Sequence, residues 1–525
     1  MKPLPVGIQT LSEIITQDYL YIDKTALAYE LIKRYKYVFL SRPRRFGKSL
    51  FLDTLKNIFL GNKELFRNLH IYNQWNWDIT YPVIKISFSG GIRDNESLRN
   101  NLFYILNDNQ ERLNIICNEK NDPNQCFAEL IKKACKQYQQ KVVILIDEYD
   151  KPILDNIENI PEALVIRDGM RDFYTKIKEN DEYLRFVFLT GVSKFSKVSL
   201  FSGLNNLEDI SLNPDFGNIC GYTQHDVDTV FAPYLEGVAM EKVKRWYNGY
   251  NFLGDNVYNP FDILLFIKNQ KTFKNYWFET GTPTFLMKLF AKEHYFLPNL
   301  EHLEVADEIL DSFDIEKIQL VTLLFQTGYL TIDKRFETFE RLRYQLKIPN
   351  QEVRLALSDH FINVYTEQSN ELKYAQQNRI YSYLTQVDLP GLQHILQALF
   401  AGIPWNNFIN NALPEFEGYY ASVLYAFFIS LNATVIPEDT TNQGQVDLTI
   451  IVENKVYIIE IKRDTAKSYE ISEKNIALQQ IQRKCYAEKY KGQGKKVIQV
   501  GMIFNTCQRN LVQMDWVVME SDECH

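Results

Sequence analysis

The first half of the chain alternates short apolar runs with longer stretches in which apolar residues recur at helical spacing. A short continuous apolar run is typical of a strand buried on both faces, and apolar residues three or four apart are typical of a helix with one buried face. The spacing of Leu52, Leu55 and Phe59 predicts a helix over 49–60. Four runs are predicted as buried strands: 37–41, 83–88, 142–147 and 186–190. Strands separated by helices predict a mostly parallel sheet with helices on both faces.

The pattern changes twice further along the chain. Between about 276 and 386 helical spacing dominates, with one predicted hairpin made by 328–332 and 344–348. This stretch is interpreted as a small helical or winged-helix module, and a structural connector is an equally good interpretation. The last section predicts a compact α/β domain, with a helix over 415–431, strands over 445–452 and 455–462, a helix over about 473–490 and a strand over 496–504. The predicted domains are therefore 1–275, 276–386 and 387–525.

Composition and charge narrow the class of protein. With 525 residues, 46% hydrophobic and 24% charged, the chain is long enough for roughly three globular domains. With a net charge of −8, the protein as a whole does not attract nucleic acid electrostatically, so any such contact needs a local basic groove. The seven cysteines include no Cys-x-x-Cys pair, which favours reduced thiols over disulfides or a zinc site. No apolar run reaches about 18 residues and no signal core opens the chain, so a cytoplasmic protein without a membrane span is expected.

The stretch SRPRRFGKSL at 41–50 lies between a predicted strand and a predicted helix. Backbone N–H groups at the start of such a helix, together with the helix dipole, hold phosphate oxygens. Lys48 would reach the β- and γ-phosphates of a nucleotide, and the Ser49 hydroxyl would ligate Mg²⁺. Gly-Lys-Ser alone occurs often by chance, but the strand and the helix around it favour a nucleotide site.

A second apolar strand that ends in acids completes such a site. Asp147 and Glu148 follow the apolar run directly, so Asp147 would hold Mg²⁺ and Glu148 would polarise an attacking water. Thr190 or Ser193, at the end of the strand predicted over 186–190, would lie near the γ-phosphate as a sensor. A simple passage from strand to loop, without such a role, is an equally good interpretation. The candidate nucleotide-binding residues are Arg44, Arg45, Phe46, Gly47, Lys48, Ser49, Leu50, Asp147 and Thr190.

Arg42 argues against a nucleotide site, because it stands where a phosphate-binding loop has its first glycine. The side chain is expected to leave the loop less able to wrap phosphates, and Arg44 and Arg45 are expected to compensate in part. Binding of a nucleotide is therefore a safer prediction than fast hydrolysis.

A second constellation lies near the end of the chain. Asp447 and Glu460 belong to two paired strands, and Glu460 and Lys462, two residues apart, point to the same face. Metal-dependent phosphodiester cleavage needs such a set: the acids and the Ile461 carbonyl hold Mg²⁺, and Lys462 orients water or neutralises charge. The alternative is an exposed hairpin with surface charges, which the very apolar strands disfavour. The candidate accessories on the flanking helices are Glu417 and Gln480.

Together these stretches resemble a bacterial family that joins an AAA-ATPase-like domain to a C-terminal PD-(D/E)XK nuclease-superfamily domain. The resemblance covers nearly the whole chain. It is carried by GIQ at 7–9, YIDKT at 21–25, RPRRFGKS at 42–49, LIDEYD at 145–150, LTGVSKF at 189–195, LFSGLNN at 200–206, WYNGY at 246–250, VYNPF at 257–261, QTGYL at 326–330, EIK at 460–462 and ALQQI at 477–481. Two departures are Arg42 in place of the loop glycine and Val446 in place of the proline that names the nuclease superfamily.

The resemblance implies an α/β fold class: a P-loop-type parallel-sheet ATPase domain, a helical or winged-helix middle module and a restriction-endonuclease-like α/β domain. It implies ATP and Mg²⁺ as cofactors. It also assigns the ATPase-type residues Lys48, Ser49, Asp147 and Glu148, the nuclease triad Asp447, Glu460 and Lys462, and the accessories Glu417 and Gln480.

The expected function is an ATP-regulated, Mg²⁺-dependent nuclease acting on nucleic acid, with DNA favoured over RNA. Basic residues near the second site are expected to follow a phosphate backbone: Arg463, Lys484, Lys489, Lys491, Lys495 and Lys496. Two alternatives stay open, a nucleotide-dependent switch or scaffold that cleaves nothing and an ATPase whose last domain only binds DNA. The sequence also leaves a homo-oligomer open.

Overall fold

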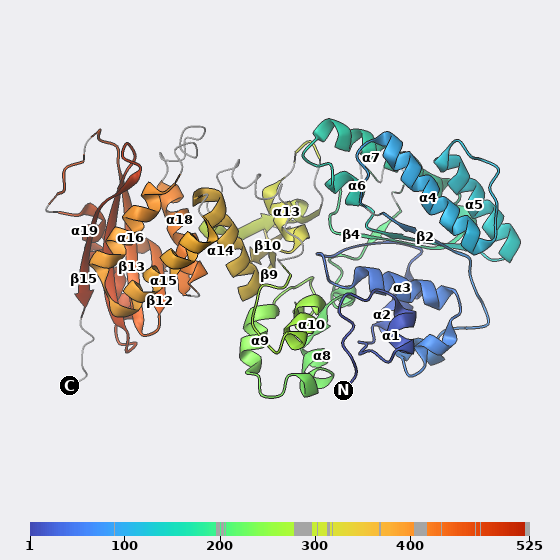
Figure 1. The fold of residues 1–525 in the computed structure, drawn as a ribbon, viewed down its shortest axis with the longest axis horizontal. Helices are drawn as coiled ribbons and strands as arrows, with labels where there is room; N and C mark the ends of the chain where they lie inside the picture. Colours follow the sequence, from blue (N-terminus) through green and yellow to red (C-terminus); the bar gives the residue numbers. More distant parts are fainter. Residues whose placement is uncertain are drawn as a thin grey trace. The chain divides into compact units, whose positions relative to one another are not determined.

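The fold is that of a computed structural model, whose described residues are 1–88, 90–195, 200, 204, 206–277, 297–301, 303–311, 315–317, 319–366, 369–403, 417–431, 433–467, 469–472 and 474–519 (Figure 1). The chain forms two compact units: Met1–Phe285 with Glu304–Glu352, and Leu286–Leu303 with Val353–His525. The predicted middle stretch 276–386 is thus divided between the two units, and the three domain boundaries stay predictions. Within the described part of the chain, no helix is long and apolar enough to cross a membrane.

The first unit contains a parallel sheet of five strands in the order β2-β3-β4-β1-β5. The strands are β1 Tyr37–Ser41, β2 Val83–Ser87, β3 Val142–Asp147, β4 Leu184–Gly191 and β5 Glu208–Asp209. The first four agree with the apolar runs, because a strand buried on both faces needs apolar residues at every position. Insertion of β4 between β1 and β3 brings the carboxyl ends of all three strands to one edge, where the candidate nucleotide residues lie.

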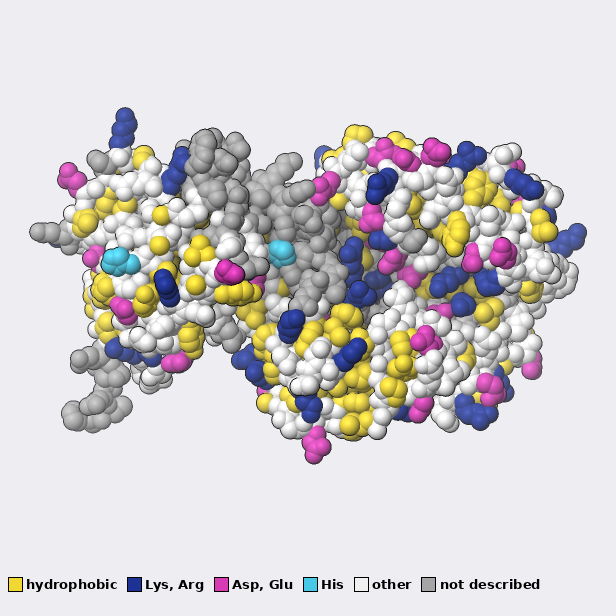
Figure 2. All heavy atoms as spheres, in the orientation of Figure 1, with side chains coloured by type: hydrophobic (Ala, Val, Ile, Leu, Met, Phe, Trp, Pro, Cys, Tyr) yellow, Lys and Arg dark blue, Asp and Glu magenta, His cyan; other side chains and the backbone are white. Residues whose placement is uncertain are grey.

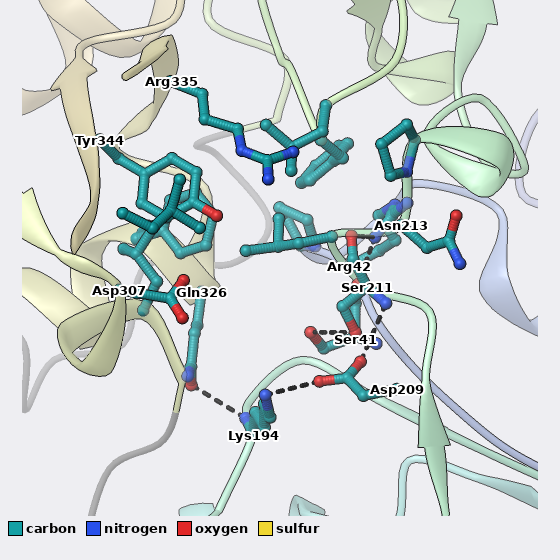
Figure 3. A pocket seen from close by; sticks show the side chains of 18 residues that line it. Ser41, Arg42, Lys194, Asp209, Ser211, Asn213, Asp307, Gln326, Arg335 and Tyr344 are labelled. Carbon is teal, nitrogen blue, oxygen red and sulfur yellow. Dashed lines mark hydrogen bonds and ion pairs between the residues drawn. The ribbon is translucent and has the colours of Figure 1, made fainter. Parts of the chain in front are cut away.

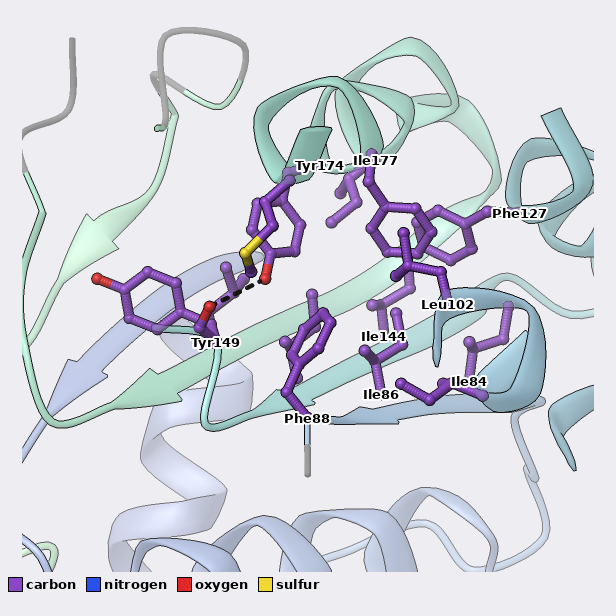
Figure 4. Packing of buried hydrophobic residues seen from close by; sticks show 14 of the residues in the cluster. Ile84, Ile86, Phe88, Leu102, Phe127, Ile144, Tyr149, Tyr174 and Ile177 are labelled. Carbon is purple, nitrogen blue, oxygen red and sulfur yellow. Dashed lines mark hydrogen bonds between the residues drawn. The ribbon is translucent and has the colours of Figure 1, made fainter. Parts of the chain in front are cut away.

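Helices cover both faces of this sheet (Figure 1). One face is covered by α4 Asn95–Leu113, α5 Pro123–Tyr138 and α7 Ile160–Glu179, and the other by α1 Leu11–Thr16, α2 Thr25–Arg34 and α3 Lys48–Phe59. Figure 4 shows the core between β2, β3 and the first set of helices, where Ile144 and Leu102 pack near Phe127. Asp94 begins α4 with a reciprocal capping box to Ser97, which fixes where this helix starts.

A small helical subdomain follows the sheet within the same unit. It consists of α8 Gln224–Thr229, α9 Met240–Tyr247 and α10 Pro260–Lys268, with the short strands β6 Tyr222–Thr223 and β7 Val257–Tyr258. The subdomain has its own core, against which Leu4, Val6, Leu20 and Ile22 from the start of the chain also pack. The Asn259 side chain accepts the N–H of Phe261 and caps α10, with Pro260 in the first turn.

The predicted hairpin is confirmed, with longer strands than the pattern indicated. Strands β9 Thr331–Thr338 and β10 Arg341–Lys347 pair antiparallel, and β8 Leu303–Ala306 lies on the other side of β10. Helices α12 Asp307–Asp311 and α13 Leu320–Thr327 precede the hairpin. Gly328 ends α13 in the left-handed conformation at φ 92°, where a Cβ would also approach Pro43 to 2.8 Å.

The second unit contains a mixed sheet in the order β11-β12-β13-β14-β15. Its strands are β11 Thr434–Thr441, β12 Gly444–Val452, β13 Lys455–Asp464, β14 Lys496–Asn505 and β15 Asn510–Met519. Only the β13–β14 pair is parallel. The parallel sheet in one unit and the mixed sheet in the other confirm the predicted α/β fold class.

Helices also cover both faces of the second sheet. One face packs against α15 Asn370–Gln386, α16 Leu389–Ala401 and α18 Glu417–Ser430: the Tyr457 hydroxyl donates to the Leu384 carbonyl, and Phe504 packs on Phe400 and Tyr420. The other face carries α19 Ile476–Arg483. The helix predicted over 473–490 is wrong in extent, because Cys485 takes a positive φ of 49° and a separate 3₁₀ turn follows at Tyr486–Tyr490. A helix, α14 Gln351–Thr366, runs across the boundary between the two units.

Side chains of both signs are mixed over the face of the molecule drawn in Figure 2. The sequence has 66 acidic and 58 basic side chains, so an even mixture is expected. A nucleic-acid contact would therefore need a local feature from which acids are missing.

Candidate functional site

Residues 42–47 form the loop between β1 and α3. Lys48, the first residue of α3, is buried, and its Nζ donates to the carbonyls of Arg42 and Pro43 at 2.9 Å each. An ammonium has three protons, so these two bonds hold the charge at the loop and leave one donor direction. Gly47 precedes the helix in the left-handed conformation at φ 90°, and no side chain caps α3. The first N–H groups of a helix without such a cap can bind an anion.

Arg42 lies beneath this loop rather than in front of it. The side chain is 1% exposed, and its guanidinium lies 4.0 Å above the ring of Phe252. Burial lowers the pKa of Arg42 to about 10. Figure 3 shows the side chain directed toward the segment that carries Ser211. The guanidinium donates to four backbone carbonyls, those of Ser41, Ser211, Phe216 and Gly217.

The expectation that Arg42 hinders phosphate binding therefore does not fit this geometry. The positive φ values of the loop fall at Arg45 (68°) and Gly47 (90°), and Arg42 needs none. Its backbone N–H donates to the Gly191 carbonyl at the end of β4. Arg42 thus ties the start of the loop to the neighbouring strand and to the segment after β5.

Replacing Arg42 by glycine, the residue usual in such loops, is expected to destabilise the protein by about 3 kcal/mol. Each buried carbonyl left without a donor costs roughly 1–3 kcal/mol, and removal of the buried charge offsets part of this. Differential scanning calorimetry of the full chain would record a lower unfolding temperature. Arg44→Gly, at an exposed position of the same loop, is the matched control. A stable Arg42→Gly protein that binds nucleotide more tightly would restore the view of Arg42 as an obstruction.

Three acids follow β3 at the same edge of the sheet. Asp147 is buried, and its Oδ1 accepts the N–H of Glu148 at 3.0 Å. Glu148 has a positive φ of 51°, and desolvation and the charge of Asp147 raise the pKa of its carboxyl. The third acid, Asp150, is the last residue of the LIDEYD stretch, and the sequence alone indicates no role for it. Its Oδ2 accepts the N–H groups of Val192 and Ser193, and burial raises its pKa to about 6.

Thr190, the candidate γ-phosphate sensor, is buried at the end of β4. Its hydroxyl donates to the Leu40 carbonyl of β1 at 2.9 Å. Ser193 is also buried, and its carbonyl accepts the hydroxyl of Tyr149. These bonds tie β4 to its neighbours, and a sensor role for either residue stays a prediction.

A cavity of about 300 Å³ opens beside Lys48 and the start of α3. Its lining combines the charged side chains of Arg44, Lys48, Glu148 and Asp150 with apolar ones. Of the candidate residues, Arg45, Gly47, Ser49 and Leu50 also line it, whereas Phe46, Asp147 and Thr190 do not. Phe46 packs instead in the interior, edge-on to Tyr250 and Phe252. The cavity wall also includes residues that carried no proposed role: Pro5, Gly7, Ile8, Gln9, Lys151, Leu154, Val192, Tyr222, Pro260, Phe261 and Leu264.

The two motifs GIQ and VYNPF, more than two hundred residues apart, thus meet at one cavity. Their signal in the sequence was family resemblance alone, since neither carries obvious chemistry. The guanidinium of Arg45 lies 4.9 Å above the ring of Phe261, which links the loop to the apolar wall. A cavity lined by cations and by an aromatic ring can accept a molecule that has phosphates and a flat apolar ring.

The second constellation is assembled in the other unit by β12, β13 and α19. Leu448 pairs with Ile459, and the Asp447 carboxylate accepts the N–H of Ile461 at 2.6 Å. Glu460 and Lys462 lie on one face of β13, with Lys462 Nζ 2.9 Å from Glu460 Oε1. The Gln480 side chain of α19 donates to the same Glu460 oxygen.

Glu460 is 2% exposed, whereas the Lys462 side chain is about a quarter exposed. The cluster therefore reaches from the protein interior to solvent, as a site open to a large substrate must. Glu417 begins α18, but its side chain lies outside the described residues. The Ile461 carbonyl as a metal ligand stays a prediction.

A glycine and an asparagine that sequence analysis missed allow Gln480 to reach Glu460. Gly501 pairs with Glu460, and a Cβ at Gly501 would lie 2.4 Å from the backbone nitrogen of Leu478. Only glycine lets α19 approach β14 this closely. Asn475 caps α19 and donates to the Gly501 carbonyl. The available signal was a glycine within the apolar strand 496–504, which often marks close backbone approach.

The basic residues predicted to follow a phosphate backbone do not all lie free on one surface. Lys489 pairs with the buried carboxylate of Asp439 and donates to the Thr440 carbonyl, so this lysine belongs to the fold. Arg463 follows Lys462 on β13 and therefore points to the opposite face of the sheet. A phosphate-binding role for the other four lysines stays a prediction.

Comparison with known proteins matches the two regions of the chain in which these sites lie. Residues 5–201 match a family described as Predicted AAA-ATPase, and residues 415–514 match the PD-(D/E)XK nuclease superfamily. A protein of Azotobacter chroococcum mcd 1, named "Uncharacterized protein in vnfD 5'region", is 44% identical over 513 residues, which is 97% of this chain and 98% of that protein. Asp447, Glu460 and Lys462 all fall within the second match. The chain therefore belongs to the bacterial family that joins a predicted AAA-ATPase domain to a C-terminal PD-(D/E)XK nuclease-superfamily domain.

Proposed function

We propose that this protein is a nucleotide-regulated, metal-dependent nuclease that cleaves phosphodiester bonds of nucleic acid, with DNA favoured as the substrate. The observation that carries the proposal is the cluster of Asp447, Glu460, Lys462 and Gln480. Burying a carboxylate at the end of apolar strands costs desolvation energy, and pairing it with an ammonium only partly offsets that cost. A catalytic role therefore explains the presence of this cluster better than a contribution to folding stability does.

The donor atoms of this cluster suit a magnesium ion. Asp447 and Glu460 would hold the cation through carboxylate oxygens, the ligands it prefers, and the Ile461 carbonyl would add a third oxygen. Bound there, the metal supplies polarisation of the phosphate and a water of lowered pKa. Among the described residues no group of three or more acidic, His or Cys side chains gathers, so the metal would rely on these oxygens and on water.

The remaining side chains have separate tasks. Lys462 has three N–H donors, of which one is used by Glu460 at 2.9 Å, and it would neutralise charge that develops on the phosphate. Gln480 is a positioning residue, because its amide holds Glu460 Oε1 and thereby sets the direction of the carboxylate. Exposure of Lys462 beside a buried Glu460 leaves the cluster open to substrate from one side.

The cavity beside Lys48 supports ATP as the regulating nucleotide. Lys48 and the start of α3 would hold phosphates, and Ser49 and Asp147 would hold the accompanying Mg²⁺. The ring of Phe261, which lines the same cavity, would contact the base. Desolvation raises the pKa of the Glu148 carboxyl, which suits a group that accepts a proton from an attacking water. Nucleotide state would then control cleavage through the chain that joins the two units.

The proposal is tested by incubating the full chain with DNA and RNA of one sequence, as single strands and as duplexes. Each is assayed with Mg²⁺ or EDTA, and with ATP, a non-hydrolysable analogue or no nucleotide. Cleavage is expected with Mg²⁺, to be lost in EDTA, to return on adding Mg²⁺ back, and to change at least several-fold with ATP. Glu460→Gln, which keeps the shape but removes the charge, should leave no cleavage.

Two results would favour other functions. Nucleotide binding without cleavage of any substrate would favour a nucleotide-dependent switch or scaffold. Binding of DNA and hydrolysis of ATP without cleavage would favour an ATPase whose second unit only binds DNA. Cleavage that persists in Glu460→Gln would mean that the bonds are cut by a contaminant or at another site.

A further inference from the structure

The tip of the β9–β10 hairpin presents a phenylalanine to solvent. Phe339 is 91% exposed. Phe339 and Glu340 form the two-residue turn, and both have positive φ, 53° and 60°. Asn-Gly is the usual choice for such a turn, because a side chain strains the left-handed conformation. An exposed aromatic residue at a strained turn helps neither solubility nor folding, so another role is called for.

The two faces of this hairpin differ in charge. Arg335 and Tyr344 form a cross-strand pair and both point toward the cavity in Figure 3, so the face that they share is the cavity face. Alternation along a strand then places the remaining basic side chains on the opposite face. That outer face carries Lys334, Phe336, Thr338, Arg341, Arg343 and Gln345, with Lys347 at its base.

Toward its tip the outer face has three cations and no acid, because Glu337 falls on the cavity face and Asp333, at a bulge near the base, pairs with Lys347. Lys334 and Arg341 are exposed, and Arg343 is half-buried. None of the three forms an ion pair with a described residue, whereas Lys347 at the base of the hairpin pairs with Asp333. A cluster of cations without acids around the tip of the hairpin, on a chain of net charge −8, is the local basic feature that nucleic acid requires.

We propose that the β9–β10 hairpin is a nucleic-acid contact, in which Phe339 stacks on an unpaired base and Lys334, Arg341 and Arg343 bind the adjacent phosphates. The inference rests on the proposed function, since it names how the first unit engages the substrate class that the second unit cuts. Stacking on an aromatic tip and cations along the backbone are the two elements of single-strand binding. An apolar pocket of a partner protein would accept Phe339 too, but it would not require the three cations beside it.

The test uses the full chain with Glu460→Gln, which removes cleavage, and fluorescence anisotropy with labelled DNA and RNA oligonucleotides of one sequence, single-stranded and duplex. Phe339→Ala is expected to weaken single-strand binding about tenfold, and Phe339→Tyr to preserve it. Arg341→Ala with Arg343→Ala should flatten the slope of log affinity against log salt by about 1.4, since two phosphate contacts are lost. Arg335→Ala, on the cavity face of the same hairpin, is the matched control and should leave binding unchanged.

A double substitution separates binding from folding. Phe339→Asn with Glu340→Gly installs the favoured turn, so it should raise the unfolding temperature and yet weaken binding as much as Phe339→Ala does. Unchanged affinity in Phe339→Ala, equal loss in Arg335→Ala, or a parent protein that binds no oligonucleotide would each overturn the proposal. Hairpin-dependent binding by a protein whose wild type cuts nothing would instead keep this inference and refute the proposed nuclease.

Discussion

Replacing Lys462 by alanine is expected to reduce phosphodiester cleavage about a thousandfold while substrate binding changes little. Removing one preorganised charged donor from the point where negative charge develops costs about two to three powers of ten in rate. Lys462 also compensates the buried charge of Glu460, so its loss removes the paired cation from that carboxylate. Initial rates on labelled DNA in Mg²⁺ measure the first effect, and anisotropy with the same DNA measures the second.

Lys455→Ala is the matched control for this experiment. Lys455 lies on the same strand, seven residues earlier, where it donates to Asn454 in the hairpin turn. Its removal should leave the cleavage rate within about twofold, since surface substitutions away from a site change little. Equal rates for Lys462→Ala and wild type would show that the cluster of Asp447, Glu460 and Lys462 is not where the bond is cut.

Replacing Lys48 by alanine is expected to weaken ATP binding about a hundredfold or more, which corresponds to roughly 3 kcal/mol. A hydrogen bond to a charged group contributes about 1.5–3 kcal/mol, and Lys48 would serve at least one phosphate. The Arg42 and Pro43 carbonyls would also lose their shared donor, which loosens the loop. Titration calorimetry with ATP and Mg²⁺ measures the affinity, and the same variant should lose the effect of ATP on cleavage.

Lys56→Ala controls for the loss of a lysine from the same helix. Lys56 lies two turns further along α3 and pairs with Asp53 instead of facing the cavity. Its ATP affinity should match that of wild type, and its unfolding temperature should be higher than that of Lys48→Ala, which leaves two carbonyls without their donor. If Lys48→Ala binds ATP as wild type does, the cavity beside α3 is not a nucleotide site, and regulation by ATP falls with it.

Several parts of both sites could be predicted because they depend on neighbours in sequence. The strand Val142–Asp147 is apolar up to its last residue and Glu148 follows directly, so both the strand and the position of these acids at its end could be predicted. Glu460 and Lys462 share a face because strands repeat every two residues, and the structure joins them at 2.9 Å. Lys48 and Ser49 follow from a strand, a loop and a helix that are contiguous in the chain.

Other features depend on segments that are far apart in sequence. Arg42 was interpreted as an obstruction, yet its guanidinium binds carbonyls about 170 residues away, and only packing decides that a charged side chain is buried. Asp150 became part of the cavity only because β4 is inserted next to β3, which brings the N–H groups of Val192 and Ser193 to its carboxylate. Strand order is set by the packing of whole layers and leaves no local signature.

The sequence by itself determined the α/β class, the two clusters of reactive side chains and the strands that carry them, because apolar periodicity and short-range spacing are local properties. Only the tertiary structure decided what surrounds those side chains. It brought Gly7–Gln9 and Phe261 to Lys48, allowed α19 to reach Glu460 across Gly501, and turned Phe339 into an exposed tip on a hairpin with one basic face. Burial and long-range contact belong to the folded chain as a whole, so no window of sequence specifies them.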